Sequence, residues 1–166
     1  RRLGRALYAS LFYGHHTSAH ILVHHVHAAT PRDPNTSRLG ESYWQFVPRA
    51  WIGAYRAGFQ AERRRRATAP LWQHPYVGNW LASIVTAGAA YALGGGVGLA
   101  AYAFAVVYAQ LQLLLSDYVQ HYGLVRDQRS DGGFEPMGAA HSWNAPHAAS
   151  SALMLNAPRH SDHHVN

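Results

Sequence analysis

The feature that most limits how this chain can fold is a long stretch without charged side chains. From Ala67 to Ser116 the sequence contains no Asp, Glu, Lys or Arg, although about a quarter of the residues in ordinary soluble domains are charged. Two apolar segments lie within it, residues 76–93 and 97–115. As helices they would be about 27 and 28 Å long, close to the thickness of a bilayer's hydrocarbon core. We therefore expect a transmembrane helical hairpin that turns at the glycines 94–96. A buried hairpin in a large soluble protein is the alternative.

The charges before the hairpin predict its orientation. Arg63 to Arg66 form a basic cluster, and the positive-inside rule places such a cluster in the cytoplasm. Because two crossings return the chain to the side it left, we expect the segment after Ser116 there too. The expected fold class is all-α, an integral-membrane helical bundle with His-rich cytoplasmic helix ends.

The chain as a whole, residues 1–166, is expected to form a single partial domain. Its expected parts are a helix over 3–27 with the first histidine cluster, a loop and interfacial helix over 28–75, the transmembrane hairpin over 76–116 and a cytoplasmic His-rich segment over 117–166. Pro and Gly residues indicate the loop, and the amphipathic stretch 43–62 is expected to lie along the membrane surface. The chain starts without Met and stops within a polar motif, so we expect a piece of a longer protein.

Histidine is the residue type that points to chemistry. The chain has 13 histidines and no cysteine, which excludes disulfides, iron–sulfur clusters and a cysteine nucleophile. Its formal net charge is +6, but the arginines outside the run at 63–66 are scattered, so we expect no nucleic-acid partner. Histidine is the commonest transition-metal ligand, and metal binding is therefore the first expectation.

The histidines that favour a metal site fall into three groups. They are His20, His24 and His25; His121; and His160, His163 and His164. On a helix, positions four apart are about 40° apart, so two such rings can share one ion, whereas adjacent histidines can point at two ions. The first stripe also carries His16 and His27, while the isolated His15, His74, His141 and His147 are individually more often surface or core residues. All-imidazole sites suit iron, copper, zinc or nickel.

Several motifs together resemble the integral-membrane di-iron alkane hydroxylases, most closely the alkane 1-monooxygenases. The motifs are H-x₃-HH at 20–25, A-T-P-R-D-P at 29–34, S-R-L-G-E-S at 37–42, H-Y-G-L at 121–124, H-S-W-N at 141–144 and R-H-S-D-H-H at 159–164. Xylene monooxygenases and membrane fatty-acid desaturases are more distant relatives of this family.

The resemblance implies two iron ions held by nine histidines. This sequence supplies His20, His24, His25, His121, His160, His163 and His164, and the other two belong to an H-E-L-x-H type motif that the family places shortly before residue 1. Carboxylates usually orient ligating imidazoles, and the candidates are Asp33, Glu41, Asp117 and Asp162, together with His141. The sequence departs from the family pattern at Ala19, Val23, Asp117 and Gln120, which affects the tuning of the site and its substrate rather than its ligands.

The resemblance also implies the reaction, the partners and the location. The family hydroxylates the terminal methyl group of alkanes to primary alcohols with O₂ and electrons from a rubredoxin or a ferredoxin. It implies a multi-pass protein of a bacterial-type inner membrane with its active site on the cytoplasmic side and its substrate taken from the bilayer. The run at 63–66 is either a docking site for an acidic donor or only a topology signal.

Three alternatives stay open. A di-iron fatty-acid desaturase and a xylene-type hydroxylase share the same ligands. A metal-binding membrane transporter is the non-enzyme alternative, which would place its ligands near the bilayer midplane rather than at helix ends.

Overall fold

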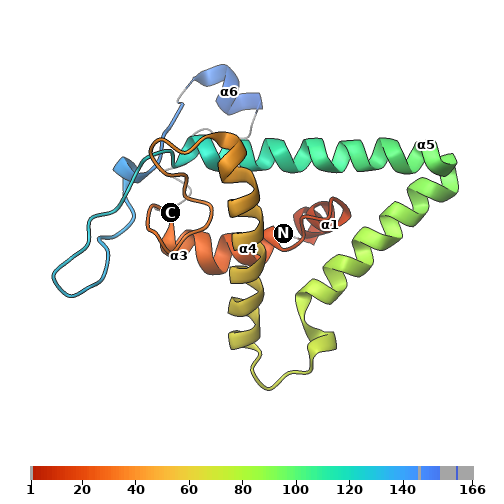
Figure 1. Ribbon diagram of the computed structural model, residues 1–166, viewed down its shortest axis with the longest axis horizontal. Coiled ribbons are helices and arrows are strands. Elements are labelled where there is room, and N and C mark those ends of the chain that lie inside the picture. The colour runs from red at the N-terminus through yellow and green to blue at the C-terminus, as the bar shows by residue number, and fades with distance from the viewer. Residues whose placement is uncertain (1, 146, 154–159, 161–166) are drawn as a thin grey trace. The chain divides into compact units, whose positions relative to one another are not determined.

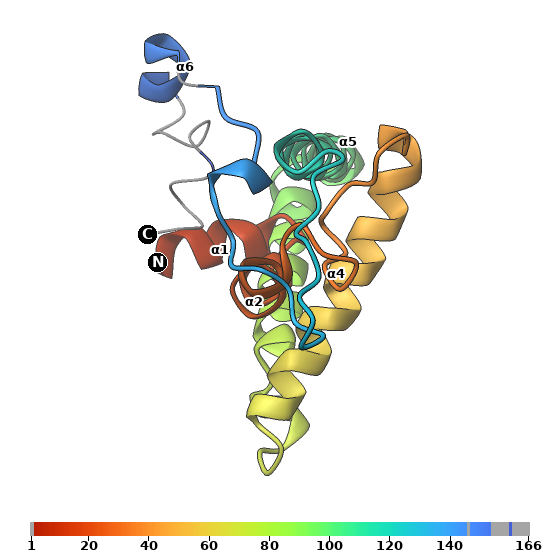
Figure 2. The ribbon, with the colours of Figure 1, turned by 90° about the vertical axis from the view of Figure 1, so that its left-hand side faces the viewer.

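The computed structural model of the protein describes residues 2–145, 147–153 and 160, and these are mostly helical (Figures 1 and 2). Those residues contain no β-strand; an isolated bridge pairs Gln128 with Phe134. The expected all-α class is confirmed.

The helices are of very different lengths. They are α1 (Arg2–Ser10), α2 (His16–Ala19), the π-helix η1 (His20–His24), α3 (His25–His27), α4 (Tyr43–Arg65), the 3₁₀ turns η2 (Leu71–Gln73) and η3 (Ala139–His141), α5 (Pro75–Gln120) and α6 (Ala148–Leu153). The chain forms two compact units, one of residues 1–23 with 52–113, and one of residues 24–51 with 114 onward.

The helix α5 contains both apolar segments and folds back on itself at Gly95 (Figure 1). Gly95 has φ 58° and ψ −146°, a conformation open essentially to glycine alone. The fold-back lies within residues 94–96, where the sequence predicts the turn. The second arm continues past residue 115 to Gln120, so Asp117 is part of the helix.

The apolar side chains of α5 are largely exposed. Leu93, Val97 and Phe104 are 91%, 82% and 74% exposed. Of the described residues, α5 is the one helix long and apolar enough to cross a membrane. Exposed apolar surface costs about 25 cal/mol per Å² in water, so this distribution suits contact with lipid.

The stretch expected as one helix over 3–27 is divided in the structure. The first helix ends at Ser10, Phe12 has a positive φ of 54°, and α2 begins at His16. Gly14 lies in this break against the side chain of Asn79, whose Cγ would be 2.5 Å from an added Cβ. Only glycine allows so close an approach.

Side chains of α5 satisfy the carbonyl groups that this break leaves without helical partners. The Ser83 hydroxyl donates to Ala9 O (2.6 Å), the Tyr102 hydroxyl to Ser10 O, and the Gln110 amide to Leu11 O (2.7 Å). Because the last carbonyls of a helix need such donors, polar residues within the apolar helix fix the end of α1. Hydrophobic periodicity carries no signal for this interaction.

The helix α4 begins with a reciprocal cap. The Ser42 hydroxyl accepts from Gln45 N (3.3 Å), and the Gln45 side chain accepts from Ser42 N (3.0 Å). This arrangement satisfies two backbone donors at the helix start. At the other end of α4, the buried Glu62 accepts a hydrogen bond from Ser18 of α2 (2.8 Å), which holds α2 against α4.

Candidate metal centre

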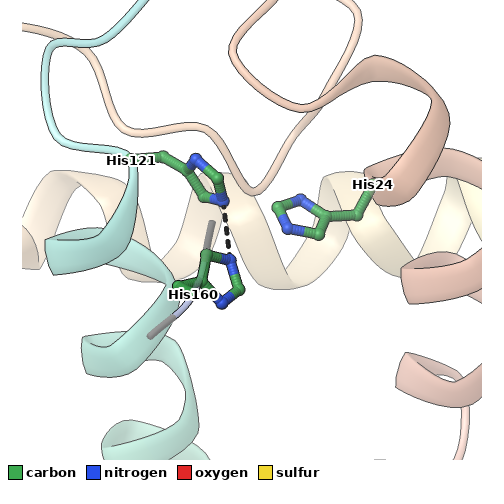
Figure 3. A group of neighbouring side chains, drawn as sticks. All are labelled: His24, His121 and His160. Atoms are coloured by element: carbon green, nitrogen blue, oxygen red, sulfur yellow. Dashed lines mark hydrogen bonds between the residues drawn. The ribbon is translucent and has the colours of Figure 1, made fainter. Parts of the chain in front are cut away.

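Three buried histidines from distant parts of the sequence meet in the second unit (Figure 3). His24 is the last residue of η1, His121 follows the last residue of α5, and His160 comes from the C-terminal region. One ring nitrogen of each lies within 4.8 Å of the others. The Nε2 atoms of His121 and His160 are 3.1 Å apart.

The spacing of the His121 and His160 rings fits a shared metal ion. Imidazole nitrogens bind zinc at about 2.0–2.1 Å, so at angles of about 90–110° two ligand nitrogens on an ion of that size are roughly 2.8–3.4 Å apart. The separation of 3.1 Å between His121 and His160 falls in that range. Three imidazoles without a carboxylate among them suit a transition metal rather than magnesium or calcium.

Asp33 orients the ring of His24. Its Oδ2 accepts a hydrogen bond from His24 Nδ1 at 2.8 Å, and both side chains are buried. Burial opposes protonation of His24, but the charge and hydrogen bond of Asp33, together with the charge of Asp117, outweigh it and raise the pKa of the imidazole. Burial raises the pKa of the Asp33 carboxyl, but His24 and the hydrogen bonds from Thr36 and Asn35 together lower it below its ordinary value. With its Nδ1 bound to the carboxylate, His24 presents Nε2 for coordination.

The loop that carries Asp33 is held by Arg49 of α4. The guanidinium donates to both carboxylate oxygens of Glu41 (2.6 and 2.7 Å) and to the carbonyls of Pro34 (2.8 Å) and Thr36 (3.0 Å). Glu41 was a candidate to orient an imidazole, but its two oxygens pair with Arg49. Bidentate pairs of this kind fix geometry as well as charge.

The same loop is fastened to the C-terminal end of α5. Ser37 Oγ donates to Tyr118 O (2.6 Å), the Tyr118 hydroxyl to Glu41 O (2.7 Å), Gly40 N to the Tyr122 hydroxyl (3.0 Å), and Asn35 Nδ2 to Asp117 Oδ2 (2.6 Å). Asp117 lies one turn before His121, yet its carboxylate accepts a hydrogen bond from Asn35. The loop, which orients His24, is thereby linked to the helix end that precedes His121.

The acceptor that orients His121 is a peptide carbonyl rather than a carboxylate. Nδ1 of His121 lies 3.0 Å from the carbonyl oxygen of His141. Because a carbonyl oxygen can only accept a hydrogen bond, the proton of the His121 ring is on Nδ1. Burial, reinforced by the nearby His24, lowers the pKa of His121 to about 4, so the ring is neutral at physiological pH. A neutral ring with its proton on Nδ1 has its Nε2 lone pair available for a metal.

Of the other predicted ligands, the described residues His20 and His25 are not in this group. His20 belongs to the first unit, where its ring stacks on His16 at 5.0 Å. His25 is half-buried, with its ring centre 6.2 Å from that of His24. The predicted ligands His163 and His164 and the candidate Asp162 lie outside the described residues.

Two isolated histidines are packed among aromatic rings of the first unit. His15 is buried, and its ring centre is 4.8 Å from that of Tyr13 and 5.3 Å from that of Tyr55. His74 is buried against Phe59 at 4.3 Å, and its Nδ1 accepts from Tyr76 N at 3.3 Å. Both positions therefore have the surroundings of core histidines, as expected for isolated ones.

Comparison with known proteins gives consistent matches over the whole chain. The fatty acid desaturase family model matches residues 1–166. The alkane 1-monooxygenase of Ectopseudomonas oleovorans is 32% identical over 172 residues, covering 100% of this chain. Alkane 1-monooxygenase 1 of Alcanivorax borkumensis is 32% identical over 170 residues with the same coverage. The xylene/toluene monooxygenase hydroxylase component of Pseudomonas putida is 29% identical over 167 residues, or 95% of the chain.

The chain spans less than half the length of these relatives. It covers 42% of each of the two alkane monooxygenases and 43% of the xylene/toluene monooxygenase component. The similarity expected from the histidine motifs is confirmed by these matches.

Proposed function

Because this chain belongs to the fatty acid desaturase family, we propose that it is the metal-binding part of a membrane non-haem di-iron monooxygenase. The reaction is hydroxylation of the terminal methyl group of an alkane to a primary alcohol with O₂ and electrons from a rubredoxin-type donor. The observation that carries the proposal is the buried all-imidazole group of His24, His121 and His160, in a chain similar to proteins named alkane 1-monooxygenase.

The histidines divide the task of holding two irons. His24, His121 and His160 offer three nitrogens to one ion. We assign the remaining ligands of this chain, from the motifs, to His20, His25, His163 and His164. Iron bound there would supply the activation of O₂ that attack on an unactivated C–H bond requires, since no side chain is a strong enough oxidant.

The surrounding residues prepare the imidazoles for metal. Asp33 keeps the proton of His24 on Nδ1, and its negative charge offsets part of the charge of a bound cation. The burial of the three rings keeps bulk water away from the ligand atoms, which strengthens the electrostatic interactions inside the site.

The membrane supplies the substrate in this proposal. The exposed apolar side chains of α5 suit lipid, and His121 follows the end of that helix. An alkane dissolved in the bilayer would reach the metal centre along such a helix. We place the protein in a bacterial-type inner membrane as a multi-pass protein, with the centre on the cytoplasmic side, where Arg63 to Arg66 would also lie.

A desaturase is the second candidate, because the family model that matches bears that name. Hydroxylation inserts oxygen, whereas desaturation removes two hydrogens and leaves the oxygen in water. The two are separated by incubating the full-length enzyme with ¹⁸O₂, a reduced rubredoxin and either an n-alkane or a fatty acyl substrate. We expect ¹⁸O in a primary alcohol of the alkane.

Three other results would contradict the proposal. An alkene product without ¹⁸O would identify a desaturase, and ring-methyl oxidation of xylene without alkane oxidation would identify a xylene-type hydroxylase. Metal uptake by vesicles without any oxidised product would identify a transporter. Iron analysis of the active preparation is expected to give about two ions per chain, and zinc in their place would exclude the di-iron assignment.

A further inference from the structure

The carbonyl group that orients His121 belongs to a tightly bonded turn. Residues Ala139–His141 form the 3₁₀ turn η3, in which His141 N donates to Gly138 O at 3.0 Å. In the opposite direction, Gly138 N donates to Nδ1 of the His141 ring at 3.0 Å. The side chain and backbone of His141 therefore close the same turn twice.

The second ring nitrogen of His141 is also engaged. Since Nδ1 accepts the Gly138 N–H, the proton of the neutral ring is on Nε2, which donates to Glu135 Oε1 at 2.9 Å. The Glu135 side chain also accepts Asp127 N at 3.0 Å. In this arrangement neither ring nitrogen of His141 is directed to a metal, although the residue lies in a histidine motif.

Trp143, two residues after His141, attaches this turn to the chain around His121. Trp143 N donates to Gln120 O at 2.8 Å, and Trp143 Nε1 donates to Tyr122 O at 2.9 Å. These acceptors are the residues immediately before and after His121. The Trp143 side chain is 56% exposed. It is therefore not a core residue, and its indole instead donates a hydrogen bond to Tyr122 O.

We propose that His141 is a positioning residue: its ring closes the η3 turn, the turn directs the His141 carbonyl at His121 Nδ1, and Trp143 keeps the two segments in register. The inference rests on the proposed function, because it assumes that His121 binds a metal. It assigns a role to the H-S-W-N motif that the ligand set does not use. Loss of such an orienting partner typically weakens metal binding about 10–100-fold.

Two substitutions of His141 separate this role from others. His141→Asn keeps an acceptor at the place of Nδ1, whereas His141→Phe keeps a ring without a donor or an acceptor. The exposed His147 provides the control, His147→Asn. The full chain is studied in detergent by Fe(II) binding, by X-ray absorption and by ¹⁵N NMR of labelled histidine.

The expected results distinguish positioning from ligation. We expect His141→Phe to weaken Fe(II) binding at least about 10-fold and to remove the His121 Nδ1–H signal. His141→Asn should stay within about threefold of wild type and keep that signal, and His147→Asn should match wild type. The number of nitrogen ligands per iron should be the same in His141→Asn and wild type.

Other outcomes would overturn the inference. Wild-type affinity and an unchanged His121 signal in His141→Phe would show that the turn does not orient His121. Equal losses in the Asn and Phe variants, with one nitrogen fewer per iron, would make His141 a ligand. Failure of the proposed function is seen separately, as a wild-type protein that binds no iron or forms no alcohol.

Discussion

Two imidazoles of the candidate centre are oriented by acceptors of different charge. His24 donates to the carboxylate of Asp33, whereas His121 donates to the neutral carbonyl of His141. A carboxylate increases the basicity of the imidazole more than a peptide carbonyl does. In the proposed centre His24 would therefore be the stronger electron donor of the two, and two ligands of the same residue type would differ in strength.

At the residue scale, the histidines provide a test of metal ligation against packing. We expect His121→Ala to abolish hydroxylation and to lower the iron content, because it removes a nitrogen from the buried group. His74→Ala should keep the iron content but destabilise the protein by about 1–3 kcal/mol, since it removes a buried ring. Metal analysis and thermal unfolding in detergent measure the two effects. Loss of iron in His74→Ala with full iron in His121→Ala would contradict the assignment.

The sequence indicates the histidines and offers Asp33 as a candidate to orient an imidazole, which the structure shows for His24, but it does not indicate that a backbone carbonyl orients His121. Spacing and composition indicate His24, His121 and His160 as ligands. The link between Asp117 and Asn35 and the carbonyl of His141 depend on contacts between distant segments. A backbone carbonyl has no signature in a sequence, so proximity along the helix pointed to Asp117 instead.

At the element scale, polar side chains in α5 determine where another helix ends. Gln110 interrupts the second apolar segment, and its amide donates to Leu11 O, just after the end of α1. The expectation of one helix over 3–27 followed from the apolar spacing of its first half. It could not include donors that are about a hundred residues away in the sequence.

Gln110 has a matched control two residues further along the same helix. Gln110→Leu is expected to destabilise the protein by about 1–3 kcal/mol, because the Leu11 carbonyl loses its donor in apolar surroundings. Gln112 is exposed, so Gln112→Leu should have an effect within about 0.5 kcal/mol. Unfolding of both variants in mixed micelles gives the comparison. Equal stability of the two would show that the bond to Leu11 contributes nothing.

The fold-back of α5 depends on one of three consecutive glycines. Gly95→Ala should cost about 1–3 kcal/mol, because φ 58° with ψ −146° is strained for any residue with a Cβ. Gly94 and Gly96 have open space at the Cβ position, so alanine there should be neutral or stabilise the helix by about 0.5–1 kcal/mol. A lower unfolding temperature in Gly95→Ala, with an unchanged or higher one in the other two variants, would support the assigned turn. A lower unfolding temperature in all three variants would contradict it.

At the scale of the whole molecule, an exposed apolar helix and a buried histidine group are features expected of a membrane metalloprotein. The most apolar helix is largely exposed, and the polar hydrogen bonds of the second unit lie in segments on either side of it along the chain. The lack of charged residues in 67–116 predicts an apolar helical region with the polar segments outside it. The detailed path of the loops was not predictable, since it depends on pairs such as Arg49 with Glu41.

The hairpin also predicts that both flanks lie on one side of the membrane. The chain has no cysteine of its own, so single cysteines at exposed positions report their side by reaction with an impermeant maleimide. Arg32 and Arg129 are exposed, whereas Thr30 and Arg126 are buried and would be poor reporters. We expect Arg32→Cys and Arg129→Cys to be labelled from the same side, and Gly94→Cys beside the turn, where a Cβ meets open space, from the opposite side. Labelling of Arg32→Cys and Arg129→Cys from opposite sides would mean that α5 crosses the membrane an odd number of times, and the hairpin would have to be abandoned.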